Sequence, residues 1–124
     1  MSIEIFKKES YLPFDMKKIT VGLVEKVKVN GEELLARVDT GAEGNSVSQN
    51  IAKKLSLGPV VKTKIIKSSS GRQIRPIVMA ELEIGGKKME AAFNITDRAH
   101  MKYPVLIGRA VLKDGFMIDP SMEE

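Results

Sequence analysis

Cysteine is absent from the 124-residue sequence, and histidine occurs once, at His100. Without cysteine the protein has no disulfide, no thiolate nucleophile and no iron–sulfur or cysteine-ligated zinc site. A single histidine also excludes a paired-histidine zinc motif. Catalytic chemistry therefore falls to carboxylates, hydroxyls or amines, and we expect no cofactor and no metal.

Aromatic residues are scarce as well: two Tyr, four Phe and no Trp, which is little for a base-stacking platform. The net charge is +4, but basic residues cluster only in pairs such as Lys53-Lys54, which is typical of a mixed charged surface. We do not expect nucleic acid as a partner, although a basic nucleic-acid-binding barrel remains our third hypothesis. No apolar run approaches the ~20 residues of a membrane span, and the charged start does not resemble a signal peptide. We expect no membrane partner and a cytoplasmic location.

Alternation of apolar and polar residues dominates the sequence and predicts strands. A half-buried strand is expected at Ile19–Val29, and the dipeptide Asn30-Gly31 favours a tight hairpin turn into a return strand at Leu34–Asp39. Regularly spaced strands with turn signals predict an all-β fold, a small barrel or sandwich. The further strands expected are Val60–Lys67, Ile74–Ile84, Met89–Ile95, Val105–Ile107 and Phe116–Ile118.

Short helices interrupt this pattern. An apolar residue at every fourth position, with Ser48 as N-cap and Gly58-Pro59 as stop signal, predicts a helix at Gln49–Leu55. A second short turn is expected at Ala110–Lys113. We interpret the methionines, including Met79, Met89 and Met117, as core filler.

The length suits one domain, which we place at residues 19–120. Residues 1–18 have weak periodicity and are interpreted as an N-terminal arm that could help to form a dimer. Residues 121–124 are then a short C-terminal tail.

The residues suited to chemistry follow the second predicted strand. Asp39 comes directly after apolar Val38, where burial and neighbouring groups can shift the pKa of a carboxylate. Thr40 adds a hydroxyl, and Gly41 allows close approach of another segment. By itself this tetrapeptide, completed by Ala42, is equally typical of a simple turn that ends a strand.

The wider context resembles the retropepsin-like aspartic proteases. Asp39-Thr40-Gly41-Ala42 resembles their active-site turn, and Val105-Leu106-Ile107-Gly108-Arg109 resembles the strand that packs behind it. The resemblance implies a closed barrel in which Gly108 and Arg109 brace the turn, with Arg109 paired to Glu43. A narrower resemblance, through segments such as Thr96-Asp97-Arg98, is to a prokaryotic branch labelled "ATP-dependent zinc protease". Because the sequence has no P-loop and no zinc constellation, we carry over only the fold.

One Asp-Thr-Gly turn supplies half of an aspartic-protease site. The resemblance therefore implies a homodimer in which Asp39 of each copy meets its counterpart. Two close carboxylates share one proton, and the pair activates a water that attacks a peptide carbonyl. Thr40 of each copy would bond across the axis. The expected partners are a second copy and a peptide or protein substrate.

The expected flap is the hairpin around Ser70, Gly71 and Arg72. The retropepsin flap tip is apolar, whereas this one is polar and basic, which would suit an acidic substrate. Arg37, on the same strand face as Asp39, adds a cation near the predicted dyad. The alternative hypothesis is therefore a catalytically silent dimer that binds a peptide or protein tail. We interpret Asp97-Arg98 as a loop ion pair.

Overall fold

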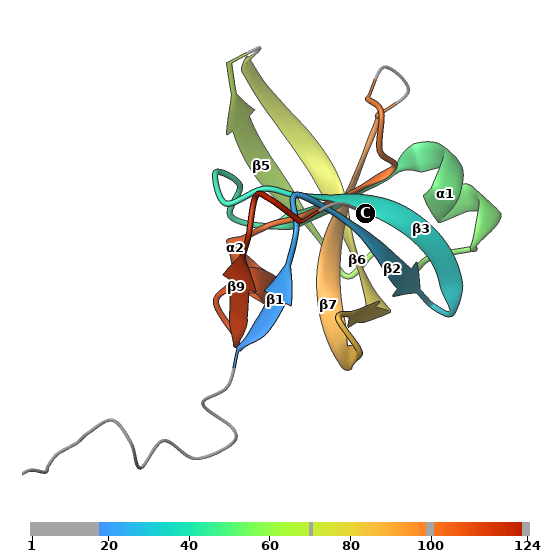
Figure 1. Ribbon diagram of the computed structural model, residues 1–124. Coiled ribbons are helices and arrows are strands. Elements are labelled where there is room, and N and C mark those ends of the chain that lie inside the picture. Colours follow the sequence, from blue (N-terminus) through green and yellow to red (C-terminus); the bar gives the residue numbers. More distant parts are fainter. Residues whose placement is uncertain (1–17, 70, 99–100, 123–124) are drawn as a thin grey trace, which may run out of the picture.

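Strands dominate the computed structural model, which describes residues 18–69, 71–98 and 101–122 (Figure 1). In order, the elements are β1 (Ile19–Val21), β2 (Val24–Val29), β3 (Glu32–Val38), β4 (Asn45–Ser48), α1 (Gln49–Lys54), β5 (Lys62–Ser68), β6 (Gly71–Ile84), β7 (Lys87–Thr96), β8 (Val105–Ile107), α2 (Arg109–Leu112) and β9 (Phe116–Ile118). The predicted all-β class with two short helices is confirmed.

Six of the strands close into a barrel. The sheet order β2-β3-β8-β4-β7-β6 returns to β2, where Val27 and Val29 lie opposite Ile84 and Leu82. Most pairs are antiparallel, but β3–β8 and β4–β7 are parallel. Strand β5 lies outside the ring and, within the part of the chain that the structure describes, pairs only with β6, so that β5 and the first part of β6 project as a hairpin (Figure 1).

The predicted strand at Ile19–Val29 is wrong as a single element. It breaks at Gly22 and Leu23, where the Gly22 amide donates to the Glu25 carboxylate at 2.6 Å. Before the break β1 pairs in parallel with β9, and after it β2 enters the barrel. Alternation continues across the break, so the sequence period does not reveal that the chain changes partner.

The predicted turn and helix signals are confirmed. Asn30 and Gly31 have positive φ angles of 49° and 86°, as a tight hairpin turn requires. Ser48 caps α1, its hydroxyl accepting from the Ile51 amide at 3.1 Å. Helix α1 ends one residue before the predicted end, and α2 begins at Arg109, one residue earlier than predicted.

The barrel interior is filled by alternating apolar residues. On β6 these are Val78, Ala80, Leu82 and Ile84, all 3% exposed or less, and burial of such a valine, leucine or isoleucine side chain contributes roughly 1.5–3 kcal/mol. The interpretation of the methionines as core filler is wrong for two of the three that were named. Met79 and Met117 are 42% and 56% exposed, while Met89 packs against the edge of the core.

The predicted domain limits remain a prediction. Of the proposed arm, residues 1–17 lie outside the described residues, and so do residues 123–124 of the proposed tail. No helix in the described ranges is both long enough and apolar enough to cross a membrane.

Candidate active site

The turn that carries Asp39 begins where β3 leaves the barrel. The Asp39 amide donates to the Ile107 carbonyl at 2.9 Å, and its carbonyl accepts from the Ala42 amide at 3.3 Å. The half-buried Asp39 carboxylate accepts from the Gly41 amide at 2.8 Å. A Cβ on residue 41 would lie 3.2 Å from this carboxylate oxygen, so glycine keeps the contact open. The turn therefore holds Asp39 by main-chain bonds on both sides.

The Gly108 segment is bonded to this turn through the main chain. The Arg109 amide donates to the Ala42 carbonyl at 2.8 Å, and the Ala110 amide donates to the Glu43 carbonyl at 2.8 Å. A Cβ on Gly108 would lie 2.3 Å from the Gly44 carbonyl oxygen, so no larger residue fits without displacement of the turn or the helix.

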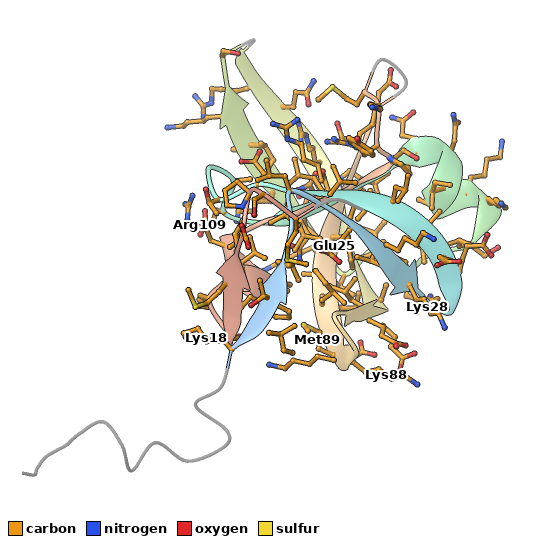
Figure 2. All side chains as sticks on the ribbon, in the orientation of Figure 1. Lys18, Glu25, Lys28, Lys88, Met89 and Arg109 are labelled. Atoms are coloured by element: carbon orange, nitrogen blue, oxygen red, sulfur yellow. The ribbon has the colours of Figure 1, made fainter. Side chains whose placement is uncertain are left out.

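The predicted side-chain pair between Glu43 and Arg109 is wrong. The Arg109 guanidinium donates to the Thr40 carbonyl at 2.9 Å, and the Glu43 carboxylate lies 3.9 Å from the Lys64 ammonium on β5. Arg109 opens α2, on the side of the molecule below the projecting hairpin (Figure 2), where the Thr40 carbonyl is within reach. The start of α2 is thus bonded to the turn by main-chain hydrogen bonds and by the bond from the Arg109 guanidinium to the Thr40 carbonyl.

The predicted flap corresponds to the β5–β6 hairpin. At the tip of this hairpin Gly71, with a φ of 114°, lies opposite Ser68. The next pair, Arg72 and Lys67, is exposed on both strands. Ser70 lies outside the described residues. Between the hairpin and the Asp39 turn is a cleft of about 1270 Å³. Its lining includes Gly41, Ala42, Glu43 and Arg109 of the predicted site, together with the flap residues Lys67 and Arg72.

A buried polar network forms the floor of the cleft, and sequence reasoning did not find it. Asn45 connects its parts: its side chain accepts from the Gly108 amide at 2.9 Å and donates to the Ala92 carbonyl at 3.0 Å. Its carbonyl accepts from the Asn94 side chain at 2.8 Å. Asn94 in turn accepts from the Arg75 guanidinium at 3.1 Å. The signal that could have found it is a polar segment, Asn45-Ser46, directly after the Asp39 turn, in a strand whose one apolar residue is Val47.

Arg98 is part of the same floor. The interpretation of Asp97-Arg98 as a loop ion pair is wrong for Arg98, which is only 8% exposed. Its guanidinium donates to the Tyr103 carbonyl at 3.0 Å and to the Ser46 hydroxyl at 3.2 Å. A buried guanidinium was not predicted because arginine is rarely buried without a partner of opposite charge.

Electrostatics at the floor are dominated by arginines. Burial lowers the pKa of Arg98, and the positive charges of Arg75 and Arg37 lower it further, whereas the Asp39 carboxylate raises it. Burial also lowers the pKa of Arg75. All these guanidinium groups stay protonated at neutral pH. The described residues contain no cluster of three or more His, Cys, Asp or Glu side chains that could hold a metal.

Solved structures define the class of this fold. The chain is similar to a Legionella pneumophila protein of unknown function, with a TM-score of 0.60 and 23% identity over 83% of this chain and 94% of that one. It is also similar to the simian foamy virus protease, with a TM-score of 0.57 and 19% identity over 73% of this chain and 91% of that one. The fold is that of the retropepsins, as the sequence resemblance implied.

The chain belongs to the RimB-like family, described as "Retropepsin-like aspartic endopeptidase RimB", which matches residues 45–124. Asp39 lies six residues before the matched region. Curated relatives include two proteins named "Probable alpha-L-glutamate ligase". The one from Shewanella pealeana is 35% identical over 63 residues, and the one from Desulfotalea psychrophila is 30% identical over 66 residues. These matches cover 50% and 52% of this chain but only 14% of each relative.

Proposed function

We propose that this protein is an aspartic endopeptidase that acts as a homodimer. The observation that carries the proposal is the Asp39 turn, anchored at both ends and opening beside a large cleft under a projecting hairpin. Membership in the RimB-like family supports the reaction class.

The proposed mechanism needs two copies of Asp39. At close range the two carboxylates share one proton and titrate as a unit. The ionised member takes a proton from a water molecule, which attacks the scissile carbonyl, while the protonated member donates to the carbonyl oxygen. The Asp39–Gly41 bond and the Gly108 brace would fix each carboxylate, so little reorganisation is needed when the copies meet.

Subunit mixing tests the shared dyad directly. Wild type should cleave a peptide library between about pH 4 and pH 7, and Asp39→Asn should not. If each site uses one Asp39 from each chain, a large excess of Asp39→Asn draws wild-type chains into inactive heterodimers and suppresses cleavage. Wild-type activity that is indifferent to the excess would overturn the shared dyad. Cleavage that is equal in wild type and variant would overturn the enzyme and favour the silent peptide-binding dimer.

Strand β9 is the edge at which we place the second copy. Among the described residues, β9 pairs only with β1, so its other edge is open. The side chain of Met117 is 56% exposed, whereas Phe116 is buried and Ile118 is partly buried. Gly115 and Asp119 direct main-chain bonds toward β1. The alternate residues Phe116 and Ile118 therefore present their amides to the open edge. An antiparallel β9–β9 pair would cover Met117 of both copies.

A single cysteine tests this arrangement, because the chain has none of its own. If the two-fold axis passes beside Met117, the two residues form a non-hydrogen-bonded pair with Cα atoms about 4.5 Å apart, within disulfide reach. Met117→Cys should form a disulfide-linked dimer in air. Met79→Cys, at an exposed β6 position, should stay monomeric in denaturing electrophoresis. Equal linking of both variants would remove the β9 interface.

The substrate that best fits the cleft is an acidic peptide. Lys62, Lys64, Lys67 and Arg72 of the flap all line the cleft, and only Lys64 has a carboxylate within ion-pair distance among the described residues. Similarity to proteins named alpha-L-glutamate ligase supports a substrate that carries glutamate. Cleavage of glutamate-rich peptides should exceed that of glutamine-rich peptides of equal length, and the excess should shrink as salt screens the charges.

A further inference from the structure

Three arginines gather at one row of the barrel wall: Arg37 belongs to the row, and Arg75 and Arg98 bind side chains in it. In the sheet register Arg37 lies opposite Leu106, Leu106 opposite Ser46, and Ser46 opposite Asn94. Side chains at register partners point to the same face of a sheet, here the face away from the core. The Arg98 guanidinium is bound to Ser46 of this row, and the Arg75 guanidinium is bound to Asn94.

The row runs beside Asp39. Asp39 follows Arg37 by two residues and so leaves β3 on the same face. The Asp39 carboxylate acts on the charge of Arg98, as do the neighbouring cations Arg37 and Arg75. Ser46, Asn94, Arg75 and Arg98 also line the cleft that the flap covers. A peptide bound over Asp39 would therefore have its side chains within reach of this row.

No carboxylate of the described residues is in contact with Arg75 or Arg98. The Arg98 guanidinium has five N–H donors, and its acceptors are a carbonyl and a hydroxyl, both neutral. Arg75 donates to the side-chain oxygens of Asn94 and Gln73, which are also neutral. The ion pairs of the described residues, Lys54–Glu32 and Lys64–Glu43, involve neither arginine. Two neighbouring cations that are partly removed from water, with no carboxylate of the described residues in direct contact, favour an anion between them.

We propose that Arg75 and Arg98 form a carboxylate-binding subsite beside Asp39, which takes an acidic side chain of the substrate close to the scissile bond. This subsite rests on the proposed function, since it is the substrate that supplies the carboxylate. The neutral partners leave donors free while they fix the guanidinium planes: Asn94 orients Arg75, and Ser46 with the Tyr103 carbonyl orients Arg98. A fixed guanidinium suits a planar carboxylate better than a mobile lysine does.

Binding can be measured without catalysis. The full-length Asp39→Asn chain is titrated with glutarate, and chemical shifts of the Arg75 and Arg98 side chains are followed by NMR. Glutarate should bind and its neutral diamide should not. In this background Arg75→Gln and Arg98→Lys should each weaken glutarate binding about tenfold or more, because each removes bidentate donors. Lys28→Gln, a cation of β2 at the opposite end of the barrel from the flap (Figure 2), should leave the dissociation constant unchanged.

Because Arg98 is buried, the Arg98→Lys variant could fail to fold. The test therefore depends on Arg75→Gln, since Arg75 is only half-buried. Glutarate binding that survives Arg75→Gln in a folded chain would overturn the subsite. Inorganic phosphate is titrated in parallel. If phosphate binds through the same arginines while glutarate does not, the site takes a free oxyanion and the assignment to a substrate carboxylate fails.

Catalysis supplies the second readout. In the active enzyme, Arg75→Gln should lower kcat/KM by a larger factor for a peptide with glutamate near the cut than for the matched glutamine peptide. A purely structural role of Arg75 would reduce both equally and would overturn the proposal. Glutarate binding that depends on Arg75, in a protein that cleaves no peptide, would overturn the proposed function while the subsite stands.

Discussion

Replacement of Gly108 by alanine should push the start of α2 away from the Asp39 turn and so destabilise the candidate active site. The added Cβ would lie 2.3 Å from the Gly44 carbonyl oxygen and 2.7 Å from the Ala42 carbonyl oxygen. Both contacts are main-chain atoms, so no flexible side chain can move aside. A tolerable separation of about 3.0 Å requires the start of α2 and the turn to move apart by about 0.7 Å, the difference between 3.0 and 2.3 Å.

The magnitude follows from what this shift breaks. Overpacking of a tight contact costs about 1–3 kcal/mol. The shift also stretches the 2.8 Å bonds from Arg109 to Ala42 and from Ala110 to Glu43 beyond useful length, at about 0.5–1.5 kcal/mol each. We therefore expect Gly108→Ala to lower the free energy of unfolding by about 2–6 kcal/mol.

Urea denaturation followed by circular dichroism measures this loss. The matched control is Gly44→Ala, because a Cβ at residue 44 has no heavy atom within 4 Å and its φ is not in the left-handed region. That control should change stability by less than about 0.5 kcal/mol. A loss below about 1 kcal/mol for Gly108→Ala, or equal losses for both variants, would show that the brace is not as tight as described.

Three further outcomes are expected. Asn45→Ala should cost about 2–4 kcal/mol in urea denaturation, because it leaves the Gly108 amide without its buried acceptor and removes a second bond; an unchanged midpoint would contradict the network. Ser48→Ala should cost about 1 kcal/mol through loss of the α1 cap, with the loss visible in the same assay. Two bonds from Ser121 lower the pKa of Asp119, so their stabilising effect is present above the unfolded-state pKa and is lost as pH falls through the folded-state pKa. Ser121→Ala should raise the pKa of Asp119 in an NMR titration, and an unaltered titration would refute this cause.

Short sequence patterns predicted the strands and turns of the barrel better than they predicted which strands or side chains pair with one another. Asn30-Gly31 specifies its own backbone, so the β2–β3 hairpin follows from the sequence. The break at Gly22 does not, because it depends on pairing with β9, almost a hundred residues along the chain. The partner of Arg109 was missed for a similar reason: a carbonyl has no signature in the sequence, so only the charged residue Glu43 was considered.

The site residues divide in the same way. Asp39 and its turn were predicted as a candidate site because a compact motif carries them. Arg98 was misread because its neighbours in sequence are polar, whereas its partner Ser46 lies 52 positions away and reaches it only through the fold. Burial of a charged side chain is a property of the assembled sheet and has no local period.

Strand β6 belongs to two structures that differ in stability. From Ile77 onward it pairs with β7 and then also with β2, and Val78 is fully buried. Before Ile77 its one partner among the described strands is β5, and Ile74 is 73% exposed. Amide protons of one continuous strand should therefore exchange with solvent on two timescales, fast before Ile77 and limited by global unfolding after it. The outer half can fray, bend or admit a ligand while every hydrogen bond of the closed ring stays in place.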